Sequence, residues 1–93
     1  MTVGTLSVKL MIREARTLKQ KRSILRSLKD QIRNRHNVSV AEVGAQNSRQ
    51  QAILGFAMAG SDGRYVDGAL AKIVDFIRRF RLVDLVDYEV EIF

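Results

Sequence analysis

The chain contains no cysteine, no proline and no tryptophan, and it has a single histidine. Without cysteine it forms no disulfide and has no thiolate chemistry. Without proline, no residue forces a helix to break. No apolar run approaches the roughly 20 residues of a membrane-spanning helix. The first ten residues alternate polar and apolar side chains, unlike the continuous apolar core of a signal peptide. We therefore expect a cytoplasmic protein without a membrane anchor.

The 93 residues are enough for one domain, so we expect residues 1–93 to form a single unit. A chain of this size buries roughly 60–68 % of the surface that its unfolded form exposes. That supports one core layer and leaves little room for a deep active-site cavity. The composition, 46 % hydrophobic and 28 % charged, is that of a globular protein rather than a disordered one.

The hydrophobic pattern predicts six elements. Period-two alternation predicts strands at about residues 5–12, 38–43, 51–59 and 84–93. Helical spacing predicts one helix from Thr17, with Gln20 completing a capping box, to Asn37 in a left-handed conformation. A second helix follows residues 60–63, which we interpret as a turn with Ser61 or Asp62 as the cap.

The order strand, helix, strand, strand, helix, strand is typical of one α+β fold. It predicts a ferredoxin-like βαββαβ sandwich, a four-stranded antiparallel sheet with two helices on one face. The spatial order of the strands is then fourth, first, third, second. The first strand carries no aromatic side chain, and Phe56 aligns with the core face of its strand. Base stacking on the open sheet face is therefore not expected.

Positive charge is concentrated in the first predicted helix and its entry loop. Segment 13–36 holds nine Lys or Arg residues against two acids, whereas the other 69 residues hold seven basic and eight acidic residues. Five of these cations recur at spacings of 3, 4, 3 and 4, which places them on one stripe of a helix. We call them the basic row: Lys19, Arg22, Arg26, Lys29 and Arg33.

The basic row lies about 115° around the helix from the apolar stripe, so it is expected to stay in water. One interpretation is contact with the phosphates of a polyanion. The other is a solvated face that aids solubility, but such a face usually mixes acids with bases, and this one has only Asp30. Lys21 falls within the apolar arc, and we expect it, like Arg35, to extend along the edge of the domain with its charge in water.

Two further groups of polar residues have simpler explanations than a catalytic or metal site. Asp87, Glu89 and Glu91 share one face of the last strand, but same-face neighbours are almost 7 Å apart, too wide for shared Mg²⁺ ligands. We expect them to protect an edge strand, with Lys9 as a cross-strand partner. His36 has no identifiable nucleophile or orienting partner, and a cation at a helix C-terminus would account for it.

Several segments together resemble the YlxP-like family, small bacterial proteins of unassigned function. They are Thr17-Leu-Lys-Gln-Lys-Arg22, Asn37-Val-Ser-Val-Ala-Glu-Val43, Gln46, Gln50 and Gly55. The resemblance covers nearly the whole chain and implies a ferredoxin-like fold. Genes of the family commonly lie among those for transcription, translation initiation and ribosome maturation, which implies an RNA or ribosomal setting without supplying a known activity.

The sequence departs from the family between the second and third predicted strands. The family usually has an acid, a tryptophan and an arginine there, whereas this chain has Asn47, Arg49 and Gln51. A role of that tryptophan would be lost here, and Arg49 instead adds a cation that extends the basic surface.

These observations predict a non-enzymatic RNA-binding protein associated with ribosomal RNA or ribosome maturation, without cofactor or metal. The basic row would contact phosphates, with Arg49 as a secondary contact. The alternative is a protein-interaction module, a homodimer or the receptor of an acidic protein, that uses a sheet edge or the open sheet face.

Overall fold

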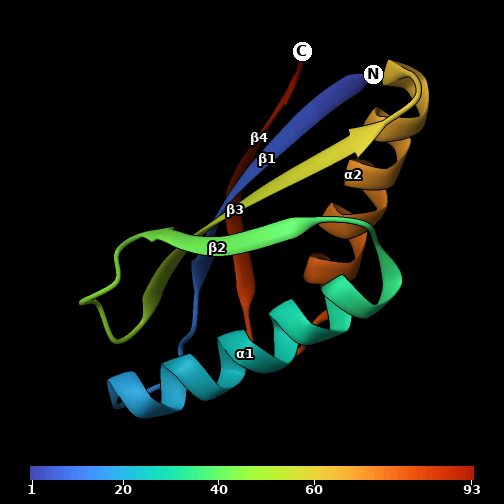
Figure 1. Cartoon of the computed structure of the whole chain (residues 1–93). Coiled ribbons are helices and arrows are strands. Elements are labelled where there is room, and N and C mark those ends of the chain that lie inside the picture. Colours follow the sequence, from blue (N-terminus) through green and yellow to red (C-terminus); the bar gives the residue numbers. More distant parts are fainter.

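The computed structural model describes all 93 residues and has the predicted order of elements (Figure 1). The strands are β1 (Thr2–Met11), β2 (Ser39–Gly44), β3 (Gln51–Gly60) and β4 (Asp84–Ile92), and the helices are α1 (Leu18–Arg35) and α2 (Gly63–Arg79). The molecule is elongated, with extents of 41 × 20 × 18 Å. Neither helix is long and apolar enough to cross a membrane.

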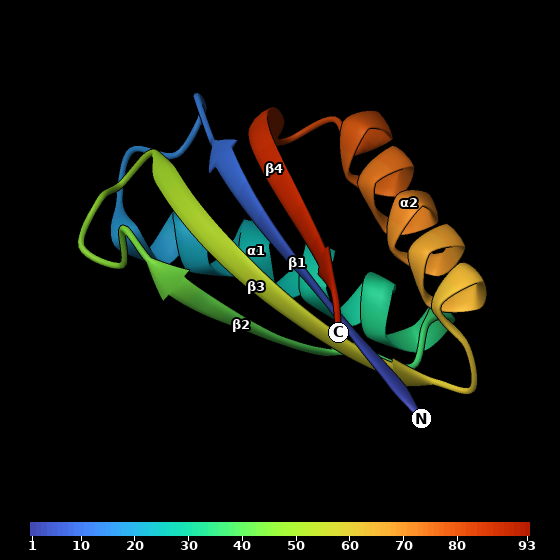
Figure 2. The same cartoon turned by 90° about the horizontal axis from the view of Figure 1, so that it is seen from above.

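The four strands form one antiparallel sheet in the order β2-β3-β1-β4. This arrangement confirms the predicted ferredoxin-like fold and places β2 and β4 at the two edges. The helices lie on the same side of the sheet and cross at a large angle (Figures 1 and 2), and Arg35 at the end of α1 lies over the Phe76 ring of α2.

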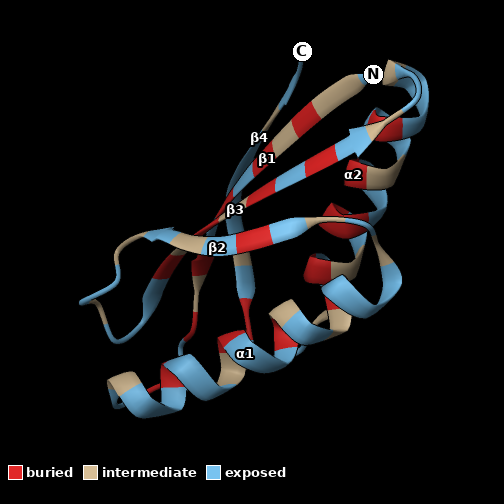
Figure 3. Ribbon diagram, viewed as in Figure 1, coloured by how far each residue is buried: buried red, intermediate tan, exposed pale blue.

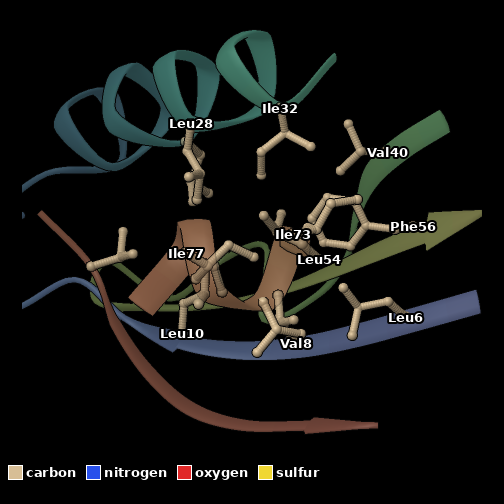
Figure 4. Packing of buried hydrophobic residues seen from close by; sticks show 14 of the residues in the cluster. Leu6, Val8, Leu10, Leu28, Ile32, Val40, Leu54, Phe56, Ile73 and Ile77 are labelled. Atoms are coloured by element: carbon tan, nitrogen blue, oxygen red, sulfur yellow. The ribbon is translucent and has the colours of Figure 1, made fainter. Parts of the chain in front are cut away.

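One hydrophobic core lies between the helices and the sheet (Figure 4). The period-two alternation puts Leu6, Val8 and Leu10 of β1 on the buried face, opposite Phe56, Leu54 and Ala52 of β3. Buried residues of both helices belong to the same cluster. Figure 3 shows the buried positions of each helix following one side of it. The other face of the sheet therefore has no helix over it.

The helix ends follow their capping residues, with two corrections. The Thr17 side chain accepts a hydrogen bond from the Gln20 backbone N–H, and that of Asp62 accepts one from the Tyr65 N–H. Gln20 Oε1 accepts from Arg16 N–H rather than closing the predicted box on Thr17. The prediction of a left-handed Asn37 was wrong: α1 ends one residue earlier, at the extended His36, whose N–H donates to the Ile32 carbonyl.

Two glycines let the start of α2 approach the sheet closely. A Cβ at Gly4 would lie 2.5 Å from Val66 Cγ1, and one at Gly60 would lie 2.6 Å from Val66 Cγ2. Val66 is fully buried and β-branched, so its side chain has few alternative rotamers. The absence of a Cβ at these two positions is therefore a requirement of the packing.

We expect Gly4→Ala to lower the free energy of unfolding by about 1–3 kcal/mol, since the added methyl overpacks the contact with Val66. Gly68→Ala is the matched control, because that helical position has open space and should gain about 0.5–1 kcal/mol. Urea denaturation of both variants measures the difference. Equal midpoints for the two variants would contradict the close packing.

Candidate nucleic-acid interface

Helix α1 holds the basic row at a fixed angle to the core. Its inward side chains Leu25, Leu28 and Ile32 are buried against the sheet. With those residues fixed, the 3.6-residue period directs the row to one flank of the helix. The row extends over 14 residues, about 21 Å at 1.5 Å per residue. Its Arg33 end lies beside β2, the strand at that edge of the sheet.

The five side chains of the basic row differ in whether they have a partner within the protein. Lys19, Arg22 and Arg26 are exposed, and Lys29 is half-buried; none of these four forms an ion pair or a side-chain hydrogen bond. Arg33 is engaged within the protein: its guanidinium lies 3.4 Å from Asp30 Oδ1 and donates to the Val40 carbonyl at 3.0 Å. The structure therefore leaves four cations of the row unpaired and ties the fifth to β2.

Arg49 lies near the beginning of α1, as an extension of the row requires. Its guanidinium donates to the Arg16 carbonyl at 3.4 Å, which joins the β2–β3 loop to the segment before the helix. Arg16 and Arg49 line a hollow of about 460 Å³ together with Ala15, Ser48 and Gln50. The sequence analysis did not single out Arg16, because its proximity to Arg49 depends on two loops far apart in the chain.

The prediction for Lys21 was wrong. Its side chain is only 1 % exposed, and Nζ donates to the carbonyls of Ala45 and Ser48, each at 2.8 Å. Nζ also lies 2.8 Å from Glu42 Oε2. Glu42 Oε2 is buried and has no aligned hydrogen-bond donor, so its contact with Lys21 Nζ is an ion pair without a hydrogen bond. Lys21 is thus a buried clamp that holds the β2–β3 loop against α1.

The sequence contained a signal for this pair that the analysis missed. Lys21 lies one turn before the buried Leu25, and Glu42 alternates with the buried Val40 on the inward face of β2. An inward lysine facing an inward glutamate is best stabilised as a pair, because an unpaired buried charge is costly. The sequence pattern indicates separately that Lys21 and Glu42 point inward, and only the fold brings the two side chains together.

The β2–β3 loop is held by further polar contacts. Gln46 Nε2 donates to the Glu42 carbonyl at 2.9 Å, and Gln50 Nε2 donates to the Arg13 carbonyl at 3.1 Å. Ala45 has a positive φ of 57°, the single such value in a chain residue other than glycine. Lys21 binds the carbonyl of this strained residue directly. Lys21, Gln46 and Gln50 of the YlxP-like pattern therefore each form a contact that holds this loop in place.

Acidic residues lie on the far edge of the sheet from α1's basic row. In the register of β1 and β4, Asp87 is opposite Lys9, Glu89 opposite Ser7, and Glu91 opposite Thr5. This confirms the predicted shared face and the cross-strand position of Lys9. The structure contains no group of three or more His, Cys, Asp or Glu side chains placed to hold a metal ion.

His36, the C-cap of α1, has an environment that disfavours the charged imidazole. Partial burial lowers the pKa of the imidazole below its usual value, and the charges of Lys72 and Arg35 lower it further. The lowered pKa of His36 opposes the predicted role of a cation at the end of the helix. Arg33 and Arg35 are the basic residues in the last turn of α1.

Fold and surface together define a small ferredoxin-like protein with one basic helix flank. Residues 3–90 match the model of a family described as "Protein of unknown function (DUF503)". An uncharacterized protein YlxP from Bacillus subtilis (strain 168) is 30 % identical over 78 residues, 84 % of this chain and 85 % of that protein. The chain therefore belongs to this YlxP-like family.

Two solved structures share the fold. The structural-genomics protein YJCS has a TM-score of 0.60 at 10 % identity and covers 96 % of both chains. The de novo designed protein Foldit4 has a TM-score of 0.56 at 11 % identity, covering 100 % of this chain and 97 % of its own. At such low identity these similarities concern the fold alone.

Proposed function

We propose that this protein is a cytoplasmic, non-enzymatic RNA-binding protein that contacts phosphates through the basic row of α1. The observation that carries the proposal is the set of four cations, Lys19, Arg22, Arg26 and Lys29, that have no partner within the protein. A rigid row of unpaired cations can neutralise successive phosphates and release their counterions. The gene setting implied for the YlxP-like family favours ribosomal RNA as the ligand.

The electrostatic contrast across the molecule supports the same proposal. The basic row and Arg49 lie with α1, whereas Asp87, Glu89 and Glu91 lie on the opposite edge strand. An approaching polyanion is therefore attracted more strongly to the basic row than to the acidic face of β4. Contacts of this kind position a phosphate chain without reading its sequence, so affinity rather than sequence discrimination is the expected property.

The salt dependence of binding tests how many cations take part. For a twelve-nucleotide oligouridine, each engaged cation contributes about −0.7 to the slope of log K against log salt concentration. Four unpaired cations give about −2.8, and release of Arg33 from Asp30 and Val40 would bring the slope to about −3.5. Fluorescence anisotropy between low and moderate salt measures this slope. A slope near zero would contradict phosphate contact by the row.

Crosslinking in cells identifies the RNA. Ultraviolet irradiation followed by purification of the protein and sequencing of attached RNA is expected to enrich ribosomal RNA or its precursors. A chain with glutamate in place of Arg22 and Arg26 is the control, because its core contacts are unchanged. Equal recovery of RNA with both chains would argue against the basic row as the interface.

A protein-interaction module is the second candidate, and the β4 edge favours it. Three large apolar side chains are exposed along that strand, namely Val86 (54 %), Tyr88 (44 %) and Ile92 (40 %). An unpaired strand edge with apolar side chains can add a strand from a second copy. Light scattering after size exclusion, at several protein concentrations, distinguishes a monomer from such a dimer.

A further inference from the structure

A groove separates the two helices near their C-terminal ends, on the flank of α1 that faces α2. Its volume is about 660 Å³. Ser27, Gln31 and Arg35 form the wall from α1, spaced four residues apart along one side of the helix. Gln31 Nε2 donates to Ser27 Oγ at 3.1 Å, which fixes the polar part of this wall. The wall extends over about 12 Å, two turns of helix.

The floor of the groove is apolar and uncovered. It consists of Phe76, Phe80 and Leu82, from the end of α2 and the loop after it. The rings of Phe76 and Phe80 lie 6.3 Å apart and tilted by 39°, and both are only partly buried. Leu82 is 42 % exposed. Phe76 and Phe80 pack against the core, and the outer surfaces of all three side chains remain in water. Covering them would be favourable.

Three arginines surround this floor without a carboxylate partner. Arg35, Arg79 and Arg81 line the groove, and none of them belongs to one of the three ion pairs of the protein. The adjacent hollow, which shares Arg81 and Leu82 with the groove, also contains the carboxylates of Glu14 and Asp84; Asp84 is paired with Arg13 at 2.6 Å, and Glu14 forms no ion pair with Arg81. Three like charges around an apolar floor favour an anionic ligand with apolar side chains.

The groove fits an acidic peptide better than a nucleic acid. The Arg35 guanidinium lies 4.8 Å from the centre of the Phe76 ring, so that face of the ring is not open to a base. The groove residues also lie about 160° around α1 from the basic row. A phosphate chain along the row therefore does not reach the groove. Guanidinium groups bind carboxylates through two parallel hydrogen bonds, and the apolar floor formed by Phe80 and Leu82 suits the apolar side chains of a peptide.

We infer that the groove between α1 and α2 is a docking site for a short acidic segment of a partner protein. The segment carries two or more carboxylates for Arg79, Arg81 and the free edge of Arg35, and large apolar side chains for Phe80 and Leu82. This site is separate from the RNA interface proposed above, so one molecule could hold RNA on one flank of α1 and a protein on the other.

The test uses a labelled ten-residue peptide in which Leu and Phe alternate with Asp and Glu, and a matched peptide with Asn and Gln in place of the acids. Binding is measured by anisotropy and mapped by ¹H–¹⁵N chemical shifts. The charge-neutral variant Arg79→Gln with Arg81→Gln should weaken binding roughly tenfold. Leu82→Ser tests the apolar floor. The control variant carries Arg64→Gln with Lys72→Gln, the same charge change at exposed positions of α2 outside the groove.

The inference is supported if the acidic peptide causes shifts confined to Ser27, Gln31 and residues 76–82, and if its binding is weakened in both groove variants but not in the control. Three results would overturn the inference. The first is that millimolar acidic peptide causes no chemical-shift change in the groove residues, or that the peptide with Asn and Gln binds as tightly as the acidic one. The second is a twelve-nucleotide oligouridine that shifts the groove more strongly than the peptide. The third is concentration-dependent burial of the groove by a second copy of the chain.

Discussion

Replacing Lys21 by methionine is expected to destabilise the protein by about 3–5 kcal/mol, a large part of the 5–15 kcal/mol typical of a domain. Methionine fills a similar volume but leaves Glu42 as a half-buried charge without its partner. It also removes the Nζ donor from the carbonyls of Ala45 and Ser48; the Ala45 carbonyl keeps the Ser48 backbone N–H, whereas the Ser48 carbonyl loses its donor. An unsatisfied buried acceptor costs about 1–3 kcal/mol.

Urea denaturation measures this loss, with Lys19→Met as the matched control. Lys19 is exposed on the same helix and has no ion pair, so its replacement should change the stability by no more than about 0.5 kcal/mol. The double variant Lys21→Met with Glu42→Leu should recover part of the loss, because it removes the orphaned charge. Similar stabilities of the Lys19 and Lys21 variants would show that the clamp does not hold the loop.

The same substitution should loosen one segment before the rest of the molecule. Lys21 is the contact that joins α1 to the β2–β3 loop at Ala45 and Ser48. Amide hydrogen exchange of residues 45–50 is therefore expected to accelerate in Lys21→Met more than exchange in β1, which lies in the centre of the sheet. Because Arg49 belongs to this loop, the basic surface near the start of α1 would lose its fixed shape.

Reversing two charges of the basic row should abolish most RNA binding. Arg22→Glu with Arg26→Glu removes two phosphate contacts and adds repulsion, so affinity for any single-stranded RNA at low salt should fall by about 50-fold. Both side chains are exposed and unpaired, so the fold should be retained. Anisotropy with a labelled oligouridine measures the affinity, and thermal denaturation checks the fold.

The matched control carries Arg64→Glu with Lys72→Glu, the same change in net charge on the exposed side of α2. If net charge alone determined affinity, this control would bind as weakly as the variant of the basic row. If the row is the interface, the control should lose only a few-fold. Equal binding by the wild type and the Arg22–Arg26 variant at low salt would reject the proposed interface.

Much of the fold could be predicted from local patterns. The alternation in 5–12 and 51–59 and the helical spacing after Thr17 correctly give the order of elements, since one buried face imposes one period on each element. The end of α1 could not be placed correctly. Asn37 is a common left-handed cap, but the chain becomes extended already at His36, and the one positive φ outside glycine is at Ala45.

The candidate interface could likewise be predicted only in part. The 3-4 spacing of the basic row correctly gives one exposed flank for Lys19, Arg22 and Arg26, because helical geometry is local. The engagement of Arg33 by the Val40 carbonyl could not be read from that spacing, because it depends on where β2 lies. The prediction for Lys21 failed for a related reason. The side chain of a lysine in the apolar arc of a helix extends either to water or to a buried partner, depending on which segment covers it.

The sequence by itself determined the element order, the inward and outward faces, and the concentration of positive charge on α1, because each depends on residues within a few turns of one another. Only the tertiary structure decided which charges are free and which are buried. Lys21 meets Glu42, Arg49 meets Arg16, and the arginines of α2 meet α1 across a groove. These meetings depend on chain crossings between distant segments, and no local period encodes them.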